Sequence, residues 1–77
     1  MGTKLKILRA LAIAEGLHML GIVMKINKDR KRPISSSNVI VDFHWLFRSG
    51  MIKEIGELYY ISTIGLQHLQ LVEVAKR

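Results

Sequence analysis

The sequence has 77 residues and a formal net charge of +6, because twelve Lys and Arg outnumber six Asp and Glu. A chain of this length builds one hydrophobic core, so we expect a single domain over residues 1–77 and exclude an enzyme with separate catalytic and substrate domains. The positive charge favours a polyanionic partner and leaves DNA, RNA and an anionic membrane surface open. No cysteine is present, which excludes disulfides and thiolate chemistry and fits a cytoplasmic protein.

No membrane segment is expected. The N-terminus is basic, but the apolar stretch behind it is interrupted by Arg9 and Glu15 and lacks the small-residue cleavage site of a signal peptide. The uncharged interval between Glu15 and Lys25 has only about half the length of a bilayer span.

Two helices are expected before the first polar loop. The first runs from Thr3, as N-cap, to about Ala14 and stops before Gly16, with apolar residues recurring every three or four positions. These apolar residues are Leu5, Leu8, Leu11 and Ala12. The second helix runs from Leu17 to about Ile26 with the same spacing. Its expected core residues are Leu17, Leu20, Val23 and Met24.

A charged loop separates the second helix from the third. It covers residues 27–33 and ends at Pro33, the only proline of the chain, which bars a continuing helix. Three serines then offer an N-cap for a third helix, which Gly50 ends. The expected core residues of this helix are Val39, Phe43 and Leu46, flanked by Ile40 and Phe47.

A β-hairpin and a last helix complete the chain. Residues 51–55 and 58–61 are apolar, β-branched or aromatic runs on either side of Gly56-Glu57, a pair that fits a type II′ turn. Side chains alternate along a strand, so one of Tyr59 and Tyr60 is expected to be buried and the other exposed. Ser62 can cap a helix that runs to the C-terminus.

The order of three helices, hairpin and helix predicts a mainly α protein with a β-hairpin, an α+β winged helix-turn-helix. Two C-terminal runs have a characteristic spacing: Leu46-Phe47-Arg48-Ser49-Gly50-Met51-Ile52 and Tyr59-Tyr60-Ile61-Ser62-Thr63-Ile64-Gly65-Leu66-Gln67-His68-Leu69. With them go Leu8-Arg9-Ala10-Leu11-Ala12 and Glu15-Gly16-Leu17-His18-Met19-Leu20-Gly21-Ile22. Together these runs resemble the PadR-like and MarR-like repressors over nearly the whole chain. Small free-standing domains of this kind also resemble regulators from archaeal viruses and plasmids.

The resemblance implies a transcriptional regulator, a repressor, that binds double-stranded DNA sequence-specifically as a homodimer. Such a protein is expected in the cytoplasm, associated with the nucleoid DNA. The chain differs from the family in a basic insertion between its second and third helices and in Ile40, where PadR-like proteins often carry a tyrosine. The family's long C-terminal dimerisation helices are also missing, and no small-molecule ligand is evident from the sequence.

The outward face of the third helix is the expected DNA-binding surface. With about 100° per residue and the core face fixed, the outward residues are Ser37, Asn38, Val41, His44, Trp45 and Arg48. Ser36, in the first turn of this helix, is expected to contact DNA as well. Asn38 and Arg48 suit base edges or phosphates, Val41 suits a thymine methyl group, and the serine N–H groups suit a phosphate. Further phosphate contacts are expected from the basic loop and the hairpin, through Lys28, Arg30, Lys31, Arg32 and Lys53.

A homodimer is expected from a second apolar stripe on the last helix. One helix cannot bury two stripes in so small a domain, and 49% hydrophobic residues is a high share for a monomer of this size. The residues expected to face the core are Leu66, Leu69 and Val72. The residues expected at the dimer interface are Ile64, His68, Leu71 and Ala75, joined by Ile7, Ala10 and Ala14 of the first helix.

Two other functions stay open, and no catalysis is expected. The acidic hairpin tip and Trp45 would suit a protein-interaction adaptor of the same fold, and the net charge would suit a basic module for RNA or a membrane surface. His18, His44 and His68 are isolated from one another, so neither a metal site nor an acid–base pair is predicted. No cofactor motif is present. Gly16 and Gly21 have the five-residue separation of a phosphate-binding loop, but the Lys-Ser/Thr that follows in such a loop is missing.

Overall fold

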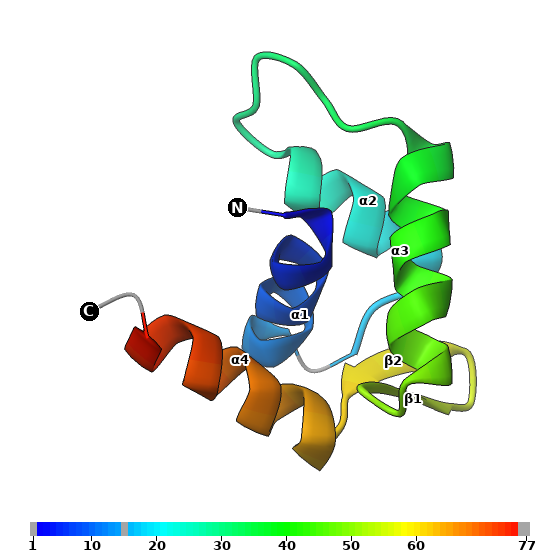
Figure 1. Ribbon diagram of the computed structural model, residues 1–77. Helices are drawn as coiled ribbons and strands as arrows, with labels where there is room; N and C mark the ends of the chain where they lie inside the picture. Colours follow the sequence, from blue (N-terminus) through cyan, green and yellow to red (C-terminus); the bar gives the residue numbers. More distant parts are fainter. Residues whose placement is uncertain (1, 15, 76–77) are drawn as a thin grey trace.

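The computed structural model describes residues 2–14 and 16–75, and these form helices and an antiparallel hairpin in the order α-α-α-β-β-α (Figure 1). The bounds are α1 Thr3–Ile13, α2 Met19–Asn27, α3 Ser36–Arg48, β1 Ile52–Ile55, β2 Leu58–Ile61 and α4 Thr63–Ala75. This confirms the predicted order of elements and the mainly helical α+β class.

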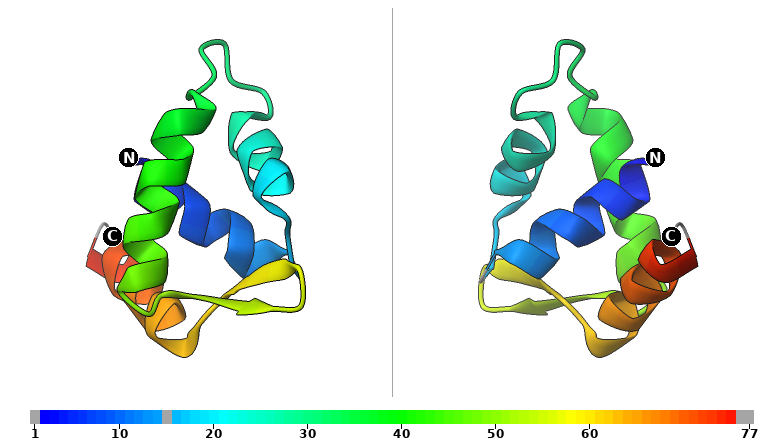
Figure 2. Two further views of the ribbon diagram at one scale, coloured as in Figure 1. Left: turned by 90° about the vertical axis from the view of Figure 1, so that its right-hand side faces the viewer. Right: turned by 90° about the vertical axis from the view of Figure 1, so that its left-hand side faces the viewer.

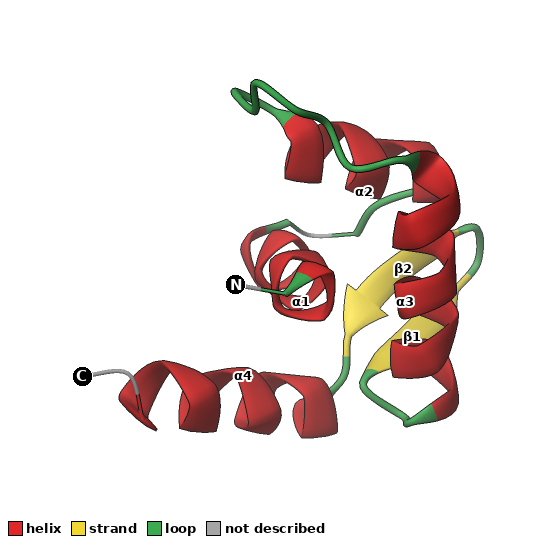
Figure 3. Ribbon diagram, turned by 45° about the horizontal axis from the view of Figure 1, so that its top comes forward, coloured by secondary structure: helices red, strands yellow, loops and turns green. Residues whose placement is uncertain are grey.

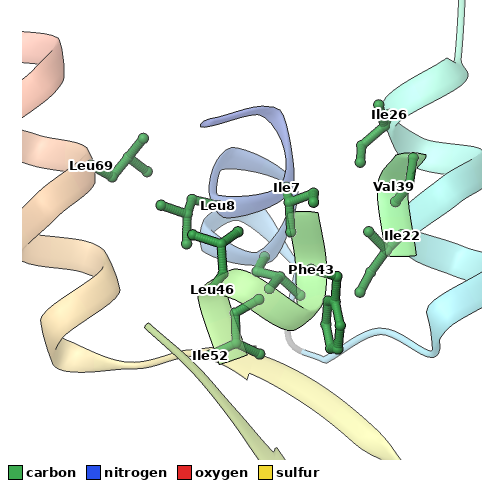
Figure 4. Packing of buried hydrophobic residues seen from close by; sticks show 10 residues of the cluster. Ile7, Leu8, Ile22, Ile26, Val39, Phe43, Leu46, Ile52 and Leu69 are labelled. Carbon is green, nitrogen blue, oxygen red and sulfur yellow. The ribbon is translucent and has the colours of Figure 1, made fainter. Parts of the chain in front are cut away.

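Helix α1 is the centre of the molecule. Figure 3 shows it nearly end-on, with α2, α3 and α4 arranged around it and the hairpin beside it. The buried side chains point toward it from these elements (Figure 4). The core consists of Ile7, Leu8, Leu11, Ile22, Ile26, Val39, Phe43, Leu46, Ile52 and Leu69.

Of the three serines that could cap helix α3, Ser35 is its N-cap, and the helix ends before Gly50 as predicted. The Ser35 side-chain oxygen accepts a hydrogen bond from the Asn38 N–H at 3.3 Å, as an N-cap does. At the other end Gly50 has a φ of +79°, and the N–H groups of Gly50 and Met51 donate to the carbonyls of Phe47 and Leu46. This pair of bonds is the Schellman motif, which turns the chain from α3 directly into β1.

The hairpin has the register of a two-residue turn. Ile52 pairs with Ile61 and Ile55 with Leu58, and Gly56 has a φ of +64°, in agreement with the expected turn. Leu17 adds an element that the sequence did not predict. Its N–H and carbonyl exchange hydrogen bonds with Tyr59 at 3.1 and 2.8 Å, so the α1–α2 connection pairs with the outer edge of β2.

The start of α4 is fixed to the end of α3. The Ser62 hydroxyl accepts a hydrogen bond from the Gly65 N–H at 3.1 Å, which confirms Ser62 as the N-cap, and donates to the Gly50 carbonyl at 2.5 Å. Gly65 packs against the Met51 carbonyl so closely that a Cβ atom there would lie 2.3 Å from the oxygen. A residue without a side chain is therefore required at the point where α4 crosses the start of the hairpin.

Several core predictions for the first two helices are wrong. Leu20 and Met24 are 69% and 64% exposed, while Ile22 and Ile26 are buried. Helix α2 begins at Met19 instead of Leu17 and is apolar on nearly all sides. The three-and-four spacing of its apolar residues therefore fits more than one choice of buried face. The N-cap of α1 is Gly2 and not Thr3, and Ala12 is exposed.

Two predictions in the C-terminal half also need correction. Leu66 is exposed instead of buried, because the buried face of α4 contains Gly65 and Leu69, which are four residues apart, and Leu66 lies beside that face. Tyr59 and Tyr60 are both half-buried. The Tyr59 ring packs on Phe43 with centroids 4.7 Å apart, and Tyr60 lies against the backbone of the α1–α2 connection at Gly16, which covers the face expected to be free.

Candidate nucleic-acid interface

The outer face of α3 is defined by what the helix buries. Val39, Phe43 and Leu46 point into the core and are almost completely inaccessible, as predicted. At about 100° per residue the opposite face must then point away from the protein. The residues exposed there are Ser37, Val41, His44, Trp45 and Arg48.

This outer face is unusually apolar for a surface in contact with water only. Val41 is exposed by 67% and Trp45 by 52%. Together with His44 and Arg48 they line a shallow depression along the helix. Single apolar residues scattered on a surface are normal, whereas here a tryptophan and a valine are exposed together beside an arginine.

A lysine from α1 reaches the same depression. The Lys4 ammonium lies 3.5 Å from a carboxylate oxygen of Asp42 and 5.0 Å from the centroid of the Trp45 ring. Asp42 is the only acidic residue of α3. Lys4 is not among the residues that the sequence indicates, because a contact between the first turn of α1 and the flank of α3 leaves no local signal in the sequence.

The N-terminal end of α3 presents exposed polar groups. Ser36, Ser37 and Asn38 are all exposed, and the Ser35 cap occupies only the N–H of Asn38. The first N–H groups of a helix have no partner within the helix, and they carry the positive end of its dipole. These groups are available to an anion that approaches the outer face.

The basic loop adjoins this end of α3. Residues 28–33 are exposed, including all four basic residues, and the described part of the chain offers no carboxylate to them within ion-pair distance. The loop is closed at its base by Asn27. The side chain of Asn27 accepts a hydrogen bond from the Ile34 N–H at 2.8 Å and donates to the Ile34 carbonyl at 3.0 Å.

Asn27 is a second residue whose role the sequence does not indicate, since its position predicts only a part of the exposed loop. Its two bonds imitate the pairing of two strands and hold the ends of the loop together. Arg30 donates from its backbone N–H to the Asn27 carbonyl, and Asp29 has a positive φ of 65°. The loop is therefore closed by specific hydrogen bonds, and its basic residues lie near the start of α3.

The hairpin lies at the other end of α3 and is less basic. Lys53 is exposed on β1 opposite Tyr60, while Glu54, Ile55 and Glu57 are exposed toward the tip. The view along the outer side of α3 shows the loop at one end of the helix and the hairpin at the other (Figure 2, left). The charge of the exposed residues therefore changes from basic at the loop to acidic at the hairpin tip.

The expected dimer residues fall into two groups. Ile64, His68, Leu71 and Ala75 are exposed on α4, as the sequence predicts for a free stripe. The assignment of Ile7 and Ala10 to an interface is wrong, because both are buried in the core of the single chain. The central helix is covered on several sides, so it buries a wider face than its apolar spacing indicates. Ala14 is half-buried at the end of α1.

Within ranges 2–14 and 16–75, no group of three or more His, Cys, Asp or Glu side chains is placed to hold a metal ion. No helix in the same ranges is both long enough and apolar enough to cross a bilayer. Comparison with known proteins found no matching family model and no curated protein with significant similarity.

Proposed function

We propose that this chain is a winged helix-turn-helix protein that binds double-stranded DNA through α3 and acts as a transcriptional regulator, a repressor. The observation that carries the proposal is the outer face of α3, where an arginine, a histidine and exposed apolar groups lie near an exposed basic loop. An α-helix with such a face fits the width of the major groove, which displays hydrogen-bonding edges and thymine methyl groups.

The arrangement of the other elements supports a winged helix. In that fold the third helix enters the groove and the hairpin, the wing, lies beside it. Here the Schellman turn at Gly50 leads α3 directly into the hairpin, and the Leu17–Tyr59 pairing widens the hairpin by a third extended segment. In this proposal the basic loop contacts phosphates on one side of the groove, and Lys53 adds one contact from the wing.

The charge distribution predicts how the affinity divides. Phosphate contacts by flexible basic side chains supply affinity without reading sequence, whereas contacts to base edges supply specificity. In the proposed complex Lys28, Arg30, Lys31 and Arg32 belong to the first class. Asn38, Val41 and Arg48 belong to the second.

The test is selection of bound fragments from a random DNA pool, followed by titration of the selected site at several salt concentrations. Replacing the four loop residues with Gln should weaken all sequences alike and lower the slope of log affinity against log salt by about one unit per lost phosphate contact. Asn38→Ala or Arg48→Ala should cost about 1–3 kcal/mol at the selected site and much less elsewhere.

A matched control separates site from net charge. The test variant is Lys31→Gln/Arg32→Gln, in the loop. The control is Lys6→Gln/Lys25→Gln, which removes the same charge from residues that line a groove between α1 and α2. Only the loop pair should flatten the salt dependence. Equal losses in both pairs, with no enriched sequence in the selection, would favour the adaptor, a function that the acidic wing tip and exposed Ile55 also suit.

We further propose that the protein acts as a homodimer joined through α4. Ile64, Leu71 and Val74 are all more than half exposed on its outer ridge, and Glu73, the one charged residue of α4, is paired with Arg9. Two copies of a chain with charge +6 repel one another, so they associate best through a surface without charge. At about 100° per residue, these ridge residues lie on the side of α4 opposite the buried Leu69.

A further inference from the structure

Lys4 connects α1 with the outer face of α3 through two contacts. Its ammonium lies 3.5 Å from a carboxylate oxygen of Asp42 and 5.0 Å from the centre of the Trp45 ring. Asp42 and Trp45 are three residues apart and are therefore neighbours on the helix surface. One side chain from the first turn of α1 thus touches both groups on this flank of α3.

Without Lys4, the carboxylate of Asp42 would oppose a polyanion. Asp42 is the only acidic residue of α3, and it lines the same depression as Val41, His44 and Arg48. Its side chain is only 26% accessible, so water screens it less than it screens a fully exposed carboxylate. Compensation by Lys4 makes the flank of α3 neutral.

The second contact orients Trp45. An ammonium group over an indole ring is attracted by the negative face of the ring, and this holds a side chain that is otherwise half exposed. With one face against Lys4, the Trp45 ring has a defined position at the rim of the depression. An ordered aromatic ring loses less conformational entropy on binding than a freely rotating one.

We propose that Lys4 is a positioning residue for DNA binding, which neutralises Asp42 and holds Trp45 at the edge of the α3 surface. Lys4 acts through these two neighbours and does not itself contact phosphate. The inference rests on the proposed DNA-binding function and adds a residue from outside the helix-turn-helix to its binding surface.

The affinity test is a cycle of variants measured on the selected DNA site at low salt. Lys4→Met should weaken binding about three- to tenfold, because it exposes one uncompensated charge to nearby phosphates. Asp42→Asn should strengthen binding by a similar factor. Lys4→Met/Asp42→Asn should then return to within about twofold of the wild-type chain, because both charges of the pair are absent.

Two further variants serve as controls. Lys4→Arg keeps the charge and the stacking on Trp45 and should bind like the wild-type chain. Lys6→Met removes the same net charge from the same helix at a position lining the α1–α2 groove, and it should have less effect than Lys4→Met. A double variant that stays as weak as Lys4→Met, or a Lys6→Met variant that is equally weak, overturns the inference.

Trp45 is the only tryptophan, so its fluorescence reports on the contact without DNA. Lys4→Met should increase quenching of Trp45 by acrylamide in a chain whose circular dichroism is unchanged, and Lys4→Arg should not. Unchanged quenching in Lys4→Met overturns the inference, because the contact would then not hold the ring in solution. A wild-type chain that binds no DNA overturns the proposed function itself, whereas a DNA-binding wild type with a weak double variant overturns only the role of Lys4.

Discussion

Helices α3 and α4 have the same length of thirteen residues and differ in how they are attached to the protein. Helix α3 buries Val39, Phe43 and Leu46 in the core, whereas α4 buries one large side chain, Leu69, and the glycine that precedes it by four residues. Helix α3 therefore forms one side of the hydrophobic core, whereas α4 contacts α1 through a narrow buried face.

The exposed faces of the two helices also differ. The face of α3 combines Arg48, His44 and a compensated Asp42 with exposed apolar groups, and a basic loop adjoins it. The ridge of α4 is formed by Ile64, Gln67, Leu71 and Val74 and carries no charge. Exposed apolar groups alone therefore do not define a partner. The charge around them separates a surface suited to a polyanion from one suited to a second copy.

The largest effect is expected from the inward face of α3. Phe43 is 2% exposed and packs edge-on against Tyr59, so it joins α3 to β2 across the core. Phe43→Ala should lower the free energy of unfolding by about 3–5 kcal/mol, through lost burial and the cavity left behind. Denaturant unfolding followed by circular dichroism measures this difference.

Val41→Ala is the matched control for that variant, because Val41 lies on the same helix and is exposed. It should change the free energy of unfolding by less than about 0.5 kcal/mol. A loss below 1 kcal/mol in Phe43→Ala would mean that α3 is not held by its inner face, and the contrast with α4 would be wrong.

The next effect concerns the ridge of α4. Leu71 is 71% exposed in the single chain, so Leu71→Lys should leave the unfolding of the monomer almost unchanged. In the dimer it would place a charge in an apolar contact. We expect the dissociation constant to rise by more than about tenfold, or about 1.4 kcal/mol, in sedimentation equilibrium.

Val41→Lys makes the same change on the outer face of α3 and should leave the dimer intact. Dimers that survive Leu71→Lys, or a wild-type chain that sediments as a monomer at tens of micromolar, would show that the ridge is not the contact between copies.

The order of elements could be predicted because its signals are local. Gly50, Gly56 and Ser62 each fix a cap or a turn locally and act as expected. Ser35 is the N-cap among the three serines that the sequence offered. Which side of a helix is buried depends on its neighbours instead. Ile7 and Ala10 were assigned to an interface because nothing in the spacing shows that α1 is surrounded by other elements.

The residues of the candidate site likewise include some that local sequence signals indicate and some that only tertiary contacts bring there. The exposure of Val41, Trp45 and Arg48 follows from the inward stripe of α3, so helical periodicity alone indicates this surface. Lys4 reaches it from a position about forty residues away along the chain, and Asn27 closes the loop through a pair of side-chain bonds. Contacts of this kind depend on tertiary packing, for which a single sequence carries no periodic signal.

The smallest effect is expected from the ion pair that ties α4 to α1. The Arg9 Nε atom donates to a Glu73 carboxylate oxygen at 3.0 Å, but both side chains are about two-fifths accessible to water. Arg9→Gln should therefore lower the free energy of unfolding by about 0.2–1 kcal/mol, and the difference should vanish in high salt. Because α4 has few buried side chains, we expect the loss to appear first as faster amide hydrogen exchange in its last two turns, while exchange in α3 stays unchanged.

Glu73→Gln should give the same pattern, and the double variant should be no worse than either single one, since both remove one interaction. Faster exchange in α3 as well would mean that α4 is a full wall of the core, and the two helices would then not differ in the way their buried residues indicate.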